Sequence, residues 1–80
     1  MDLLLAIQQY VEKLMEYGYY PKAKKPSLGK LEKMADLCMA GKHRKLSRYV
    51  PSDADEAIKK ELDELMKKIK EITKNENKNN

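Results

Sequence analysis

Apolar side chains at helical spacing occupy both ends of this 80-residue chain, and their periodicity constrains the fold more than any other feature. Near the N-terminus, intervals of four and three residues alternate between Leu3, Ile7, Tyr10, Leu14 and Tyr17. This spacing places the side chains on one face of a helix, which we expect over residues 3–17. Gly18 suits the left-handed conformation that ends many helices.

The C-terminal part of the chain repeats the pattern, and its apolar residues form what we call the C-terminal seam. The seam consists of Ile58, Leu62, Leu65, Ile69 and Ile72. It predicts an amphipathic helix over residues 53–74, with Ser52 as the N-cap. Because coiled coils use the same spacing, we expect the seam to serve both the chain's own core and a second copy or another partner. The sequence therefore predicts a homodimer.

The segment between these helices is broken by proline. Pro21 and Pro26 each remove a backbone donor and favour extended backbone before them, which predicts a connector. Ser27 follows and suits the N-cap of a second helix, which we expect over residues 27–40.

Two shorter segments complete the chain. Residues 43–50 are basic with three apolar residues among them, which predicts a short helical turn. Residues 75–80 contain no apolar side chain, so we expect a disordered tail. The elements together predict an all-α fold over residues 1–74. It is a small three-helix bundle with a basic, proline-containing connector and a long C-terminal helix.

Positive charge is concentrated in the middle of the chain. The whole sequence carries 17 Lys and Arg against 13 Asp and Glu, and residues 21–50 hold nine of those cations with two acids. The cations form a first cluster of Lys22, Lys24 and Lys25 and a second cluster of Lys42, Arg44, Lys45 and Arg48. Such clusters bind the phosphates of nucleic acids regardless of base sequence. The neighbouring Tyr19 and Tyr20 are suited to stacking on unpaired bases. This pattern predicts a nucleic-acid contact.

Two alternatives to this contact remain open. The first is a solvated connector that keeps a small protein dispersed, and the excess of Lys over Arg, 15 to 2, favours it. The second is a helix-turn-helix formed by residues 27–40 and 43–50, although its second element would span only about two turns.

The sequence lacks the patterns of metal sites, phosphate-binding loops and catalytic centres. A structural zinc site needs four clustered ligands, and the chain has one cysteine, Cys38, and one histidine, His43. The lone cysteine is compatible with a reducing cytoplasm. It lies on the predicted buried face of its helix, where a thiol is inert. We therefore expect no enzyme activity, no metal, no cofactor and no small-molecule substrate.

Membrane targeting is not expected either. The apolar N-terminal stretch lacks a basic leader region and a small-residue cleavage site, so it does not resemble a signal peptide. No apolar run approaches the ~20 residues that cross a bilayer. We therefore expect no membrane contact and a cytoplasmic location.

The function that the sequence favours is non-catalytic binding of a macromolecule. We expect a small helical adaptor or inhibitor, with a protein partner favoured over a nucleic acid. Short Lys-rich helical proteins of this kind are often regulators of mobile elements or phages (viral proteins). The alternative is a nucleic-acid-binding protein that uses residues 21–50.

Overall fold

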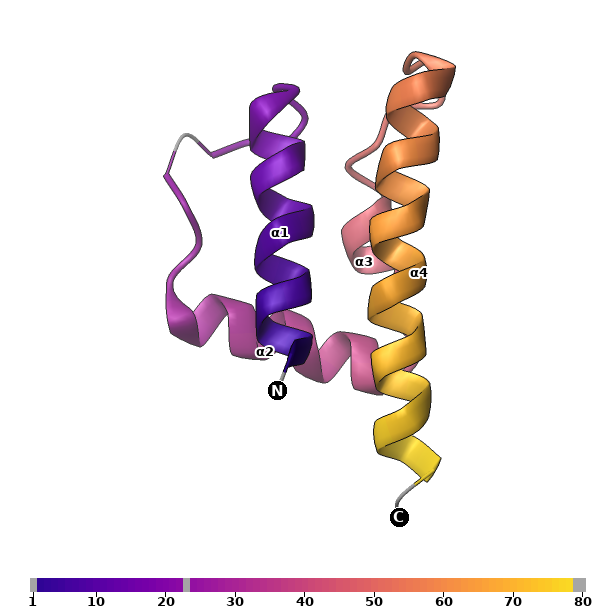
Figure 1. The fold of residues 1–80 in the computed structure, drawn as a ribbon. Helices are drawn as coiled ribbons and strands as arrows, with labels where there is room; N and C mark the ends of the chain where they lie inside the picture. The colour runs from indigo at the N-terminus through magenta and orange to yellow at the C-terminus, as the bar shows by residue number, and fades with distance from the viewer. Residues whose placement is uncertain (1, 23, 79–80) are drawn as a thin grey trace.

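The fold is an all-α bundle, as the sequence predicts (Figure 1). The computed structural model describes the backbone of residues 2–22 and 24–78 and the side chains of residues 3–22 and 24–75. The helices in these ranges are α1 (Asp2–Glu16), α2 (Leu28–Met39), α3 (Arg44–Ser47) and α4 (Glu56–Lys78). These ranges contain no β-strand.

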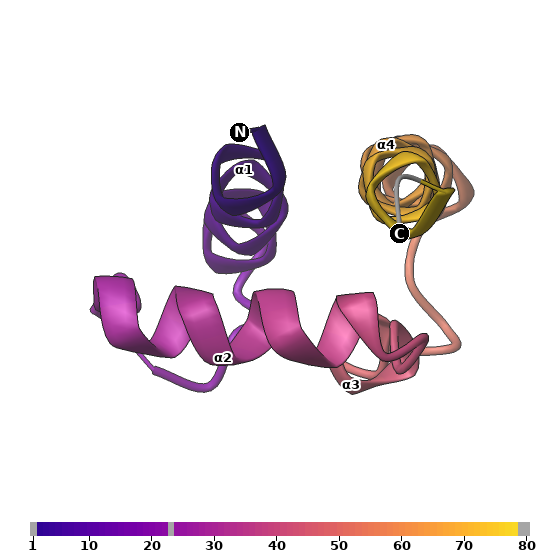
Figure 2. The ribbon, with the colours of Figure 1, turned by 90° about the horizontal axis from the view of Figure 1, so that it is seen from below.

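The helices pack in two layers. In Figure 1, α1 runs upward and α4 runs downward beside it, so the two long helices are antiparallel neighbours. Figure 2 shows α2 lying across this pair, with the short α3 near the far end of α2. One face of the α1–α4 layer is therefore covered by α2 and α3.

The core lies where these layers meet. It joins the predicted apolar faces of α1 and α4, and α2 and α3 close it from one side. Its most deeply buried members are Ile7, Tyr10, Val11, Leu14, Cys38, Leu46, Leu62 and Ile69, each at most 1% exposed. Because α1 and α4 face each other along their apolar stripes, most of the predicted periodicity is satisfied within one chain.

Local chemistry sets several of the helix ends. Gly18 and Gly41 adopt positive φ angles of 78° and 79°, a conformation that costs glycine little, and they follow α1 and α2. The predicted N-cap of α2 is confirmed, because the Ser27 hydroxyl accepts a hydrogen bond from the Lys30 N–H at 3.3 Å.

The start of α4 differs from the prediction of residue 53. The helix begins at Glu56, and Asp55 is its cap, since its carboxylate accepts the Ala57 N–H at 2.9 Å. Ser52 lies instead within a turn that the Ala54 N–H closes onto the Pro51 carbonyl at 3.1 Å. Because of this turn, α4 begins three residues later than predicted.

The end of α4 also differs from the prediction. The sequence predicts a stop at residue 74 and a disordered tail over 75–80, but the helix continues to Lys78, while 79 and 80 lie outside the described residues. Extending a formed helix adds one hydrogen bond for each residue ordered, so a helix can continue through polar residues. Among the described helices, none combines the length and apolar character that crossing a membrane demands.

Truncating a core leucine tests the packing of α1 against α4. The Leu62→Ala variant removes a side chain that is 1% exposed, so the free energy of unfolding should fall by about 2–5 kcal/mol. Leu28→Ala is the matched control, because Leu28 is 63% exposed, and we expect a change within ~0.5 kcal/mol. Urea titrations followed by circular dichroism measure both, and equal losses of stability would contradict this core.

A second pair of variants tests which residue caps α4. Asp55→Ala removes the observed cap and should cost about 1 kcal/mol of unfolding free energy. Ser52→Ala should cost less than ~0.5 kcal/mol, because its exposed side chain lies outside the helix. Thermal melts of both variants measure the difference, and a larger destabilisation at Ser52 would identify that residue as the cap.

Candidate functional site

The second predicted cluster of cations lies around an open hollow, which we call the basic hollow. Its walls come from the turn after α2, from α3 and from α4. The hollow has a volume of about 630 Å³, and its lining residues are Gly41, Lys42, His43, Arg44, Lys45, Arg48 and Lys70. The cluster that the sequence predicts is therefore brought together, and α4 adds Lys70 to it.

The geometry of the hollow follows from the short segment between α2 and α3. Gly41 reverses the chain, and the Lys42 N–H reaches back to the Leu37 carbonyl at 2.8 Å. Leu46 then anchors α3 in the core at 1% exposure. A four-residue helix with one buried leucine leaves its cationic side chains on the outer side.

The charge of the basic hollow is uncompensated within the described part of the chain. None of its five Lys and Arg side chains forms an ion pair with a described carboxylate, whereas Lys13, for example, lies 3.4 Å from Glu61. All five are exposed. The Arg48 guanidinium lies 5.6 Å from the centroid of the Tyr49 ring, a cation–π contact that restricts its position.

His43 forms the inner wall of the hollow. Its Nε2 lies 3.3 Å from Oγ1 of Thr73, and the Thr73 hydroxyl donates to the Lys70 carbonyl at 2.9 Å. Burial lowers the pKa of His43, and the positive charge of Lys70 lowers it further. His43 is therefore neutral near pH 7.

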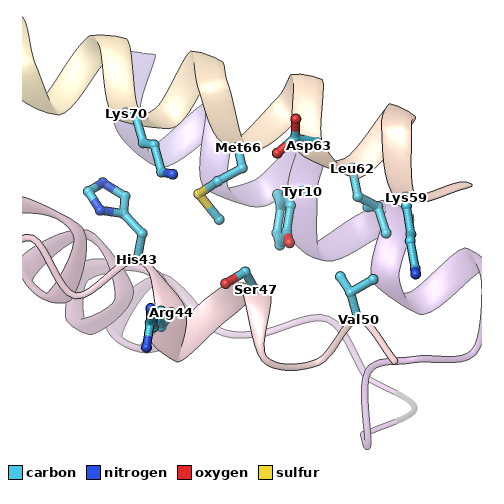
Figure 3. A pocket seen from close by; sticks show the side chains of 10 residues that line it. All are labelled: Tyr10, His43, Arg44, Ser47, Val50, Lys59, Leu62, Asp63, Met66 and Lys70. Carbon is cyan, nitrogen blue, oxygen red and sulfur yellow. The ribbon is translucent and has the colours of Figure 1, made fainter. Parts of the chain in front are cut away.

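A smaller cavity, which we call the Tyr10 pocket, adjoins the basic hollow (Figure 3). It has a volume of about 220 Å³. Its lining residues are Tyr10, His43, Arg44, Ser47, Val50, Lys59, Leu62, Asp63, Met66 and Lys70. Three of them, His43, Arg44 and Lys70, also line the basic hollow, so the two cavities are neighbours along α3 and α4.

Tyr10 of α1 lines this pocket. Its side chain is 1% exposed, and its hydroxyl forms no hydrogen bond with a described residue. Burial raises the pKa of Tyr10 to about 12, and the negative charge of Asp63 contributes to the shift. The hydroxyl therefore keeps its proton near pH 7 and remains a hydrogen-bond donor.

The first predicted cluster lies elsewhere. Lys22, Lys24 and Lys25 belong to the connector before α2, at the opposite end of that helix from α3 (Figure 2). Lys25 is paired with Glu12 at 3.4 Å. Lys22 lies close to Lys30, and this contact lowers the pKa of the Lys30 ammonium group. The two clusters therefore form separate surfaces rather than one continuous basic face.

The tyrosines proposed for base stacking have different environments. Tyr20 is 7% exposed and packs edge-on against Tyr49, with ring centroids 5.4 Å apart. Its ring is part of the core in this structure, and its predicted stacking on an unpaired base stays a prediction. Tyr19 is half-buried beside Tyr17, with ring centroids 6.1 Å apart, and its predicted contact stays a prediction.

The C-terminal seam is directed mainly into the chain's own core. Leu62 and Ile69 are at most 1% exposed there, and the other three members, Ile58, Leu65 and Ile72, are half-buried against it. A shallow outer groove between α1 and α4 retains apolar surface from Leu5, which is 53% exposed, and Ile72. Homodimerisation through the remaining surface stays a prediction.

Other reactive groups are placed as structural residues. Cys38 is 1% exposed, and burial raises the pKa of its thiol to about 11, which suppresses the thiolate. His43 is hydrogen-bonded to Thr73. Within the described side chains, no group of three His, Cys, Asp or Glu residues could hold a metal ion.

Comparison with known proteins does not extend this description. No protein-family model, curated protein or solved structure matches the chain. The chemistry of the site therefore rests on its own residues.

The neutral state of His43 predicts a pH dependence of stability. Its pKa in the folded chain lies below the unfolded value of about 6.5, so the unfolded chain takes up the proton first as pH falls. The free energy of unfolding should therefore be highest above pH ~7 and decrease as the pH falls through the unfolded-state pKa of about 6.5.

The His43→Gln variant is the control for this prediction, because the chain contains one histidine. Its side-chain amide can donate to Thr73 but does not titrate. Urea titrations across this pH range should give a flatter profile for the variant. Identical slopes for both proteins would contradict the assignment.

Proposed function

We propose that this protein is a non-catalytic nucleic-acid-binding protein that contacts the phosphate backbone through the basic hollow. The observation that carries the proposal is the convergence of five Lys and Arg side chains on a hollow that contains no carboxylate. Bringing like charges together destabilises a fold unless an anionic partner offsets the repulsion. A phosphodiester chain supplies regularly spaced negative charge and releases counterions when cations bind it.

The kind of cation supports phosphate as the ligand. Both arginines of the chain, Arg44 and Arg48, lie in the basic hollow, although lysines outnumber them across the sequence. A guanidinium presents a planar fork of donors that matches two phosphate oxygens. The hollow therefore combines bidentate donors with the point charges of Lys42, Lys45 and Lys70.

The second candidate function is the adaptor or inhibitor role, which the outer groove between α1 and α4 favours. The exposed side chain of Leu5 there offers apolar surface for a protein partner. Binding through such a surface should tolerate salt, whereas binding through the basic hollow should weaken steeply as salt rises.

A set of charge-neutralising variants tests the proposal. The hollow variant carries Lys42→Gln, Lys45→Gln and Arg48→Gln. Because each substitution should remove about one phosphate interaction, the slope of log affinity against log salt should flatten by roughly two to three units. Affinity at about 50 mM salt should fall more than ~100-fold. Fluorescence anisotropy with labelled DNA and RNA oligonucleotides measures both quantities.

A matched control removes the same charge elsewhere. Lys33, Lys60 and Lys74 are exposed, lie outside both cavities and belong to neither basic cluster, so their combined replacement by Gln should change the slope by less than about one unit. Equal weakening in both variants would show that net charge alone governs binding and would contradict a site at the hollow. Wild-type protein that binds neither DNA nor RNA at low salt would overturn the proposal.

A further inference from the structure

The position of the Tyr10 pocket links it to the basic hollow. His43, Arg44 and Lys70 line both cavities, so a ligand whose phosphates lie in the hollow has the pocket directly beside it. At about 220 Å³, the pocket is smaller than the roughly 300–1,000 Å³ of sites for drug-sized ligands. Its size therefore suits one small group that extends from a backbone held in the hollow.

The lining of the pocket suits a flat, partly apolar group with polar edges. Figure 3 shows Leu62 and Met66 of α4 on one side, with Ser47 and Val50 facing them from the α3 segment. These side chains offer apolar contact together with the Ser47 hydroxyl. A nucleobase has the same combination of apolar faces and hydrogen-bonding edges.

The Tyr10 hydroxyl gives an independent indication of a ligand. It belongs to a side chain that is 1% exposed, and it has no hydrogen-bond partner among the described residues. Every fully enclosed side-chain polar atom that the structure describes does have a partner, so the small exposed part of Tyr10 includes this oxygen, which opens onto the pocket. Because it is exposed on the pocket wall, the hydroxyl can donate a hydrogen bond to a polar atom of a ligand that enters the pocket. A phenylalanine would fill the same space in the core, so the hydroxyl adds nothing to the packing.

We infer that the Tyr10 pocket receives one unpaired base of a single-stranded nucleic acid whose phosphates lie in the basic hollow. This inference rests on the proposed function and adds to it a preference for single strands. A base in a duplex would first have to unpair and unstack before it could enter the pocket, and this step costs free energy. An unpaired base avoids most of this cost. The base is read by contact with Met66 and by the hydroxyls of Tyr10 and Ser47.

The test separates recognition of the base from recognition of the backbone. Anisotropy titrations compare a short oligo(dT) strand, an abasic strand of the same length and a duplex of the same length. The oligo(dT) strand should bind about 5- to 100-fold more tightly than the abasic strand, with the same salt slope. The duplex should bind more weakly than the oligo(dT) strand.

Variants of the pocket provide the second arm. Tyr10→Phe keeps the core filled and should reduce oligo(dT) affinity about two- to tenfold while leaving abasic binding unchanged. Ser47→Leu fills the pocket and should act in the same direction. The hollow variant of Lys42, Lys45 and Arg48 should instead weaken both strands together.

The outcomes distinguish the two proposals. Equal affinity for the oligo(dT) and abasic strands, or an undiminished oligo(dT) affinity in Tyr10→Phe, overturns the base-binding inference and leaves backbone binding in place. Tighter binding of the duplex than of the single strand also overturns it. Absence of binding to all three probes overturns the proposed function itself, and the inference with it.

Discussion

The packing of α1 against α4 is the interaction on which the rest of the structure depends. Ile7 and Leu14 of α1 meet Leu62 and Ile69 of α4, and each buried side chain of this kind contributes about 1.5–3 kcal/mol relative to exposure. The two helices lie far apart in sequence and become antiparallel neighbours through this contact (Figure 1). Helix α2 packs across the layer formed by α1 and α4, and it buries Leu31, Met34 and Cys38.

The same packing places the candidate site. Because Leu62 and Met66 point inward from α4, Lys70 of the next turn lies at the edge of the core, where it meets the α3 segment. Leu46 fixes α3 from the other side. The cations of the basic hollow are therefore held by apolar anchors rather than by ion pairs with described residues, which leaves their charge available to a ligand.

The core and the candidate site meet at Tyr10. Its ring belongs to the core, and its hydroxyl lies in the pocket next to the basic hollow. Removing the whole Tyr10 side chain would disrupt both the core packing and the pocket. Removing only the hydroxyl oxygen changes the pocket and leaves the core packing in place. His43 has a similar double position, since it lines both cavities while its ring is hydrogen-bonded to the buried Thr73.

The sequence by itself determined the helices, the Ser27 cap and the grouping of Lys42, Arg44, Lys45 and Arg48, because periodicity, capping and charge are local properties. It did not determine the start of α4, since Ser52 and Asp55 both suit a cap and the turn after Pro51 selects Asp55. Only the tertiary structure decided what covers the C-terminal seam and what joins the basic cluster. Periodicity identifies an apolar face but not the surface that buries it, and Lys70 and Tyr10 reach the site through contacts between distant segments.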